Sequence, residues 1–159
     1  MLSLILAGGR IMAQSLSQDL IHIVFSTKNR VPFLGDNIRS RLHAYLATVL
    51  RNKKSFVHNV GGTKDHVHIL CNLPREISQS DLIGVLKNLS SKWMKEQGCS
   101  DFYWQRGYGV FSVSYAHTEK VKSYIEHQME HHRETSYQEE FLKFLKMTGV
   151  QYDERYLWD

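Results

Sequence analysis

The chain has 159 residues, of which 42% are hydrophobic and 23% charged, as expected for one globular domain that folds without disulfide or metal crosslinks. Lysine and arginine outnumber aspartate and glutamate by 20 to 16, and the resulting net charge of +4 permits a polyanionic partner without requiring one. The two cysteines form no CxxC pair, which excludes a disulfide scaffold and indicates reduced thiols in a cytoplasmic protein.

The first residues differ in composition from the rest of the chain. An apolar stretch at 1–6 is followed by Gly8, Gly9 and Arg10, and Met12 offers a second start. Six apolar residues are too few to span a membrane, and no basic region precedes them as it would in a secretion signal. We interpret residues 1–12 as a dispensable leader and residues 13–159 as a single domain without a membrane partner.

Hydrophobic periodicity then predicts four strands and four helices. Strands are expected at residues 19–27, 56–60, about 65–73 and 110–115, where the pattern has a period of two. Helices are expected at residues 36–51, about 80–97, 117–132 and 137–147, where apolar residues recur every three or four positions. Gly61 and Gly62 predict a tight turn that makes the second and third strands a hairpin. The tail at 149–159 is rich in aromatic residues and is expected to dock on the domain.

The order strand, helix, strand, strand, helix, strand is typical of the ferredoxin-like α+β fold, the split βαβ arrangement. It predicts a four-stranded antiparallel sheet with two helices on one face, followed by C-terminal helices, one of which carries Tyr124. Because side chains alternate along a strand, Val67 and Ile69 should pack under the two helices. His66 and His68 should then face the open side of the sheet.

The stretch from Asp65 to Leu70 places two imidazoles one residue apart. His66 and His68 lie on the same side of the predicted strand and can therefore reach one divalent ion. Two polar residues on a solvated strand face are the alternative interpretation, because His-x-His pairs also occur by chance. Asp65 is a candidate to orient one of the rings, although alternation places it on the opposite face.

A second candidate group follows at Tyr124 and Gln128. The two residues are four positions apart and share a helical face, which His131 also joins. An amide oxygen suits Mg²⁺ or Mn²⁺, and a phenol beside a metal-bound phosphate can attack phosphorus. A tyrosine at this spacing is also compatible with a simple packing role.

Several segments together resemble one family, the single-tyrosine HUH transposases of bacterial insertion sequences. Its His-hydrophobic-His element is matched by His66-Val67-His68, and its Tyr-x-x-x-Gln element by Tyr124 and Gln128. The segments 26–30, 104–108, 112–114 and 152–159 are also similar to those of family members. The resemblance covers the chain from about residue 13 to its end.

The resemblance implies a fold and an activity. It implies a ferredoxin-like sheet, one Mg²⁺ or Mn²⁺ ion held by His66, His68 and Gln128, and Tyr124 as the nucleophile. Such enzymes cleave and rejoin single-stranded DNA at insertion-sequence ends, which carry hairpins, through a 5′-phosphotyrosine link. The resemblance further implies a homodimer in which the tyrosine helix of one subunit serves the histidine pair of the other.

Basic residues outside this group are candidate DNA contacts. They lie after the first strand, on the two sheet-packing helices, and in the loop before the fourth strand. They are Lys28, Arg30, Arg39, Arg41, Lys87, Lys92 and Arg106. Trp104 and Tyr108 could stack on bases. We expect His127, His131 and His132 to be exposed helix residues, with a role as further ligands or as supports of the ligands as the alternative.

Two other classes of protein fit part of the pattern. One is a non-catalytic nucleic-acid-binding protein on the same fold, such as a domesticated relative of the transposases. The other is a zinc protein that uses His66, His68 and His131. Zinc prefers nitrogen and sulfur ligands, whereas Gln128, the third ligand implied by the resemblance, offers an amide oxygen.

Overall fold

The computed structural model describes residues 16–158, so the leader predicted at 1–12 lies outside the described residues. The chain runs through β1 (Leu20–Ser26), the short helix η1 (Lys28–Arg30), α1 (Asp36–Asn52), β2 (Val57–Gly62), β3 (His66–Asn72), α2 (Gln79–Glu96) and β4 (Gly109–Ser112). It continues through η2 (Tyr115–His117), α3 (Thr118–Glu126), α4 (Gln128–His131) and α5 (Tyr137–Thr148). None of the helices in this described part has the length and hydropathy needed to cross a membrane.

The strands form one antiparallel sheet in the order β2-β3-β1-β4, which confirms the predicted ferredoxin-like topology. In the central pair, Val24 of β1 lies opposite His68 of β3, and Ser26 lies opposite His66. Side chains on paired antiparallel strands share a face when they are directly or diagonally opposite. This register therefore brings His22 of β1 to the same face as His68.

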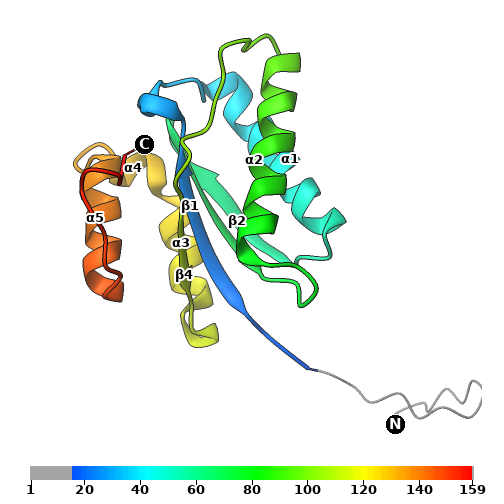
Figure 1. The fold of residues 1–159 in the computed structure, drawn as a ribbon, viewed down its shortest axis with the longest axis vertical. Coiled ribbons are helices and arrows are strands. Elements are labelled where there is room, and N and C mark those ends of the chain that lie inside the picture. Colours follow the sequence, from blue (N-terminus) through cyan, green and yellow to red (C-terminus); the bar gives the residue numbers. More distant parts are fainter. Residues whose placement is uncertain (1–15, 159) are drawn as a thin grey trace, which may run out of the picture.

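The first face of the sheet is covered by α1 and α2, as predicted (Figure 1). Ile23, Phe25, Val67 and Ile69 point into this layer and are fully buried against leucines of the two helices. The helix α2 begins at the predicted position because the Ser78 side chain accepts a hydrogen bond from the Asp81 amide. This layer is the main hydrophobic core.

The second face of the sheet is not open, which corrects the prediction for His66 and His68. Helices α3, α4 and α5 lie on the side of the sheet opposite α1 and α2 (Figure 1). Ile125 of α3 packs on Leu20 and Leu70, whereas apolar side chains of α5 pack on Val24. The physical reason is visible in β1, which also carries the apolar Leu20 and Val24 on this face and so requires cover on both faces.

The predicted helix 117–132 is interrupted, which is a second correction. It ends at Glu126, and a separate short turn of helix begins at Gln128. His127 between them leaves the helical region with φ −96° and ψ 18°, and its Nδ1 lies 2.7 Å from the Ser123 carbonyl oxygen. Tyr124 and Gln128 are therefore on different helices, joined by this bend.

The fourth strand and the C-terminal tail depart less from the predictions. The fourth strand is shorter than predicted because the ladder ends where the Val113 amide donates to the Leu20 carbonyl and η2 begins. The tail docks as predicted: Leu157 and Trp158 pack on the cluster formed by Tyr137 and Phe141 of α5.

Close approach of α3 to β2 generates the first prediction. A Cβ at Gly61 would lie 2.6 Å from the Cγ2 atom and the carbonyl oxygen of Ile125. We expect Gly61→Ala to lower the free energy of unfolding by about 1–3 kcal/mol, because α3 must shift away from the sheet. Denaturant unfolding measures this change.

The matched control for this substitution is Gly84→Ala. A Cβ at Gly84 meets nothing within 4 Å, and the residue lies inside α2, where alanine favours the helix by up to about 1 kcal/mol. Unchanged stability of Gly61→Ala would show that α3 is not held against β2 as described.

Candidate active site

His66 and His68 are both buried on the second face of the sheet, with 1% and 0% of their surfaces exposed. Each ring is held through its Nδ1 atom. His66 Nδ1 lies 2.7 Å from Asp65 Oδ1, and His68 Nδ1 lies 2.9 Å from His22 Nε2. Both rings consequently present Nε2 to the same space, which is the arrangement found where imidazoles serve as metal ligands.

Asp65 orients His66 although alternation predicted the opposite face for it. The residue precedes the first residue of β3, so the strand alternation does not apply to it. Burial opposes its ionisation, but hydrogen bonds from His66 and Thr63 outweigh burial and hold the pKa of Asp65 below its usual value. The Asp65 carboxylate therefore holds the His66 ring by its Nδ1 atom and turns Nε2 toward the interior.

Burial keeps the neighbouring imidazoles neutral. It lowers the pKa of His22 to about 4 and that of His68 well below the usual value, where adjacent histidines add to the effect. A neutral imidazole keeps one ring nitrogen free to bind a cation. His22 was not singled out from the sequence, because nothing in β1 distinguishes it from a buried polar residue.

The sequence also failed to indicate Glu140 of α5, which reaches the same space. Its Oε2 lies 3.3 Å from His68 Nε2, 3.7 Å from His66 Nε2 and 2.9 Å from His132 Nε2. Burial, and then the charge of Asp65, raise the pKa of Glu140 to about 8. The available signal was its position among Tyr137, Phe141 and Phe144, which places a carboxylate on the apolar face of an amphipathic helix.

Gln128 lies inside this group, and its amide is fully buried. Its Oε1 is 3.3 Å from His66 Nε2, and its Nε2 donates to Glu140 Oε1 at 3.1 Å. Of the three histidines expected to be exposed, His127 is exposed, whereas His132 belongs to the cluster. His131 is half-buried, and its Nε2 lies 3.8 Å from Glu140 Oε1, whereas His132 Nε2 lies 2.9 Å from Glu140 Oε2. His132 therefore lies closer to the cluster than His131, the third histidine of the alternative zinc site.

The donor set fits a divalent cation. His66, His68, His132 and Glu140 offer ligand atoms that all lie within 4.8 Å of one another. His68 Nε2 is buried and has no hydrogen-bond partner, which costs free energy unless a cation binds there. Imidazole nitrogens and a carboxylate oxygen are ordinary ligands for such an ion.

Tyr124 of α3 lies beside this group and is partly buried. Its ring centroid is 5.9 Å from that of His68 and 5.4 Å from that of His131, both in edge-to-face contact. His22 and Phe144 complete its surroundings. The structure thus brings Tyr124, Gln128, His66 and His68 together, although 56 positions separate His68 from Tyr124.

A hollow of about 470 Å³ opens next to the cluster. It is lined by His132 and Tyr137 on the inside and by Arg30, Lys64 and Arg133 among the residues at its border. These three cations outnumber the one carboxylate in the lining, that of Asp65, and so attract an anion such as a phosphate backbone. Arg30 is therefore the predicted DNA contact that the structure places nearest the buried group.

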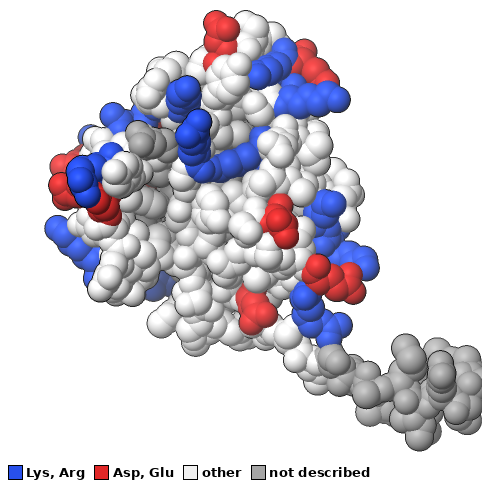
Figure 2. All heavy atoms as spheres, in the orientation of Figure 1, with Lys and Arg blue, Asp and Glu red and all other residues white. Residues whose placement is uncertain are grey.

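The other predicted DNA contacts lie elsewhere, and some of them are already engaged with other side chains of the protein. Lys28, Lys92 and Arg106 are exposed. Arg39 pairs with Asp36 at 2.8 Å, and Arg41 bonds to Gln97 and lies over the Trp93 ring. Figure 2 shows basic side chains at the upper end of the visible face and along its right and left edges, with acidic side chains among them.

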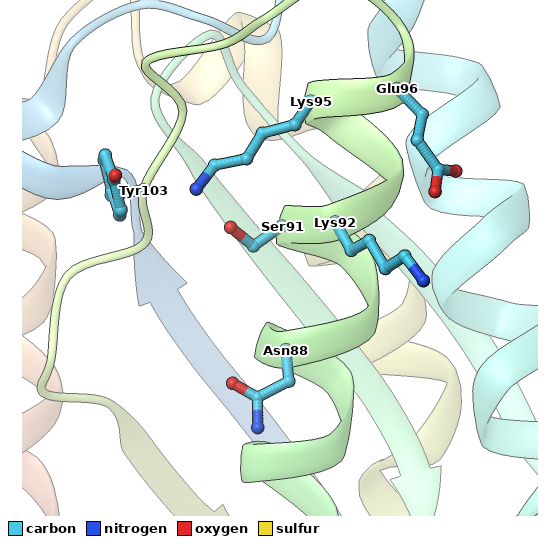
Figure 3. Close-up of a pocket in the computed structure, with 6 residues that line it drawn as sticks. All are labelled: Asn88, Ser91, Lys92, Lys95, Glu96 and Tyr103. Carbon is cyan, nitrogen blue, oxygen red and sulfur yellow. The ribbon is translucent and has the colours of Figure 1, made fainter.

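A second hollow, of about 740 Å³, lies on the outer side of α2 (Figure 3). Lys92 and Lys95 border it, and Lys95 Nζ points at the Tyr103 ring, 4.0 Å from its centroid. Trp104 is not available for base stacking, because it is buried against Phe25 and donates to Ser90 Oγ.

Comparison with known proteins identifies related chains. The family model described as "Transposase IS200 like" matches residues 15–128. Transposases for insertion sequence element IS200 from Salmonella typhimurium and Salmonella typhi are 34% identical over 117 residues, which is 69% of this chain and 76% of theirs.

Two solved structures share the fold. A candidate transposase from Deinococcus radiodurans R1 has a TM-score of 0.57 at 22% identity, over 77% of this chain and 98% of that one. A REP-associated tyrosine transposase bound to a REP hairpin also has a TM-score of 0.57, at 14% identity, over 78% of this chain and 74% of that one.

The hydrogen bonds of Lys87 generate the second prediction. Its Nζ donates to the carbonyl oxygens of Gln105, Arg106 and Gly107 at 2.7–3.1 Å, and burial lowers its pKa to about 8. We expect Lys87→Ala to lower the free energy of unfolding by about 1.5–3 kcal/mol, because the loop loses its charged donor. Lys92→Ala, on the exposed side of the same helix, should change it by less than about 0.5 kcal/mol. Equal effects in chemical denaturation would contradict this structural role for Lys87.

Proposed function

Because the chain belongs to the family of IS200-like transposases, we propose that it cleaves single-stranded DNA at the ends of an insertion sequence and rejoins it. The observation that carries the proposal is the contact of the Tyr124 ring with His68, one of the buried pair His66 and His68. A tyrosine in this position has a phenol available as a nucleophile and a cation-binding group beside it. Since its substrate is cellular DNA, we place the protein in the cytoplasm of a bacterial or archaeal cell.

His66, His68 and Gln128 are the proposed ligands of a divalent ion, Mg²⁺ or Mn²⁺. The orphaned Nε2 of His68 supports this role, and so does the position of His66 Nε2, which faces the same space while Nδ1 is bonded to Asp65. Such an ion, when bound, supplies Lewis-acid polarisation of a phosphate oxygen. Asp65 and His22 hold the two rings so that both Nε2 atoms stay turned toward that position.

Tyr124 is the proposed nucleophile. Its phenol oxygen forms a bond to phosphorus, the bond from phosphorus to the 3′ oxygen breaks, and the DNA leaves with a free 3′-hydroxyl. The 5′ side then remains on Tyr124 as a phosphotyrosine ester. A 3′-hydroxyl of another strand end reverses the same exchange, so the energy of the ester serves for rejoining and no ATP is consumed.

The DNA is proposed to approach through the hollow bordered by Arg30, Lys64 and Arg133. Lys28 and Arg106 would contact the backbone farther along. A hairpin near the element end is proposed to contact Arg39, Arg41 and Lys92. We add Lys95 to this set because it lies beside Lys92 on α2 (Figure 3). Lys87 contributes by shaping the loop at 105–107, since its ammonium group is already engaged.

The third prediction concerns a covalent adduct. Incubation with single-stranded DNA that carries an element end and with Mn²⁺ should yield a protein–DNA adduct on a denaturing gel. Tyr124→Phe should abolish it, because phenylalanine has no oxygen to attack phosphorus, and a chelator should abolish it as well. Tyr115→Phe, at an exposed tyrosine of η2, should leave the yield unchanged.

The same experiment separates the alternative functions. Binding of the DNA on a native gel without any adduct would support a non-catalytic nucleic-acid-binding protein. Stoichiometric zinc in the purified protein, with no adduct in Mn²⁺, would support a zinc protein. An adduct that persists in Tyr124→Phe would refute the proposed nucleophile.

We also propose a homodimer with active sites formed in trans. In one chain α3 packs on its own β2 and β3, so the exchange requires α3 to leave its sheet through the segment 113–117. The same contacts re-form on the partner, which keeps the cost of such an exchange low.

The fourth prediction tests the exchange by mixing two inactive variants, His66→Ala and Tyr124→Phe. A trans site predicts that the mixture recovers the adduct, and that the DNA is attached to the His66→Ala chain, which a size tag identifies. If the mixture stays inactive while wild-type protein forms the adduct, Tyr124 serves the histidines of its own chain.

A further inference from the structure

Glu140 occupies a position in the buried group that the residues matched to the family do not account for. The match ends at Gln128, and Glu140 lies twelve positions beyond it on α5. We propose that Glu140 is a direct carboxylate ligand of the ion held by His66 and His68, with His132 beside it, and that this set selects a first-row transition ion over Mg²⁺. The inference rests on the proposed function only in assuming that the cluster holds an ion.

The distances fit a common ion. Ligand atoms bound at about 2.0–2.2 Å to one ion lie roughly 3.0–3.6 Å from each other in octahedral or tetrahedral geometry. Glu140 Oε2 is 3.3 Å from His68 Nε2, and Gln128 Oε1 is 3.3 Å from His66 Nε2, both within this range. Glu140 Oε2 is 3.7 Å from His66 Nε2, just beyond it. The carboxylate is thus placed as well for coordination as the amide oxygen is.

The two oxygens of Glu140 have different partners. Oε1 accepts a hydrogen bond from Gln128 Nε2 at 3.1 Å, whereas Oε2 faces the Nε2 atoms of His66, His68 and His132. Gln128 therefore fixes the rotation of the carboxylate and leaves Oε2 toward the imidazoles. This gives Gln128 a positioning role toward Glu140 in addition to the oxygen that it offers itself.

Charge supports the same assignment. A divalent cation surrounded only by imidazoles and an amide would be buried with its full charge, which is costly in a site of low polarity. Glu140 is only 3% exposed and is itself costly as an ion without a partner. A cation at the cluster satisfies the carboxylate and the unpartnered His68 Nε2 together.

The donor types determine which ion is preferred. Mg²⁺ favours oxygen ligands and keeps several of its waters, whereas His66 and His68 offer nitrogen and are almost wholly shielded from solvent. Nitrogen-rich sites bind Mn²⁺ and the later divalent ions of the first row more strongly. Two or three imidazoles with one carboxylate therefore favour Mn²⁺, Co²⁺ or Zn²⁺ over Mg²⁺.

The test measures metal binding without DNA. Metal-free protein is titrated with Mn²⁺, and binding is measured by calorimetry and by the electron paramagnetic resonance of the free ion. A second titration uses Mg²⁺ and is measured by calorimetry. We expect Mn²⁺ to bind at least about tenfold more tightly than Mg²⁺. We expect Glu140→Gln to weaken Mn²⁺ binding by at least about tenfold, since the variant keeps the shape but loses the charge.

Glu130→Gln is the matched control, because Glu130 is an exposed residue of α4 and the substitution changes the net charge equally. Its Mn²⁺ affinity should equal that of the wild type. Mn²⁺ binding by Glu140→Gln within twofold of wild type would overturn the inference, and so would equal affinities of the wild type for Mn²⁺ and Mg²⁺.

A second measurement needs no variant and so remains decisive if Glu140→Gln fails to fold. In a crystal of the wild type grown with Mn²⁺, anomalous scattering locates the ion. An ion about 2.2 Å from a Glu140 oxygen supports the inference, and one more than about 3 Å away overturns it. Because neither experiment contains DNA, a missing covalent adduct would refute the proposed function and leave this result standing.

Discussion

The pairing of β1 with β3 is the constraint on which the site depends. The antiparallel register sets His22 diagonally across from His68, so that one ring supports the other through a 2.9 Å contact. A shift of one residue would turn every side chain of β3 to the other face and move both imidazoles into the layer of α1 and α2. The apolar residues that alternate with His66 and His68 prevent such a shift, because Val67 and Ile69 are fully buried in that layer.

Burial then determines the chemistry of the group. It lowers the pKa values of His22 and His68 and so keeps these rings neutral, so that each retains one unprotonated nitrogen. It raises the pKa of Glu140 to about 8, and the charge of Asp65 adds to the effect. Neutral imidazoles and an uncompensated carboxylate around one point are the electrostatic conditions under which a divalent cation binds most favourably.

The two faces of the sheet have separate tasks. The layer under α1 and α2 is an apolar core, and the outer side of those helices carries much of the basic surface. The layer under α3, α4 and α5 is smaller and contains the polar cluster between aromatic side chains such as Tyr137, Phe141 and Phe144. The site is consequently supported by a rigid sheet on one side and by helices near the end of the chain on the other.

The sequence by itself determined the order of strands and helices, the ferredoxin-like topology and the family, because periodicity and short motifs are properties of neighbouring residues. It also indicated His66, His68, Tyr124 and Gln128 as one group, through the resemblance of their two motifs to those of the family. Only the tertiary structure decided that the histidine face is covered and that the chain bends at His127. It likewise decided that Asp65, His22, His132 and Glu140 join the group. These contacts depend on how α5 and β1 pack against β3, and such packing between distant segments leaves no periodic signal in the chain.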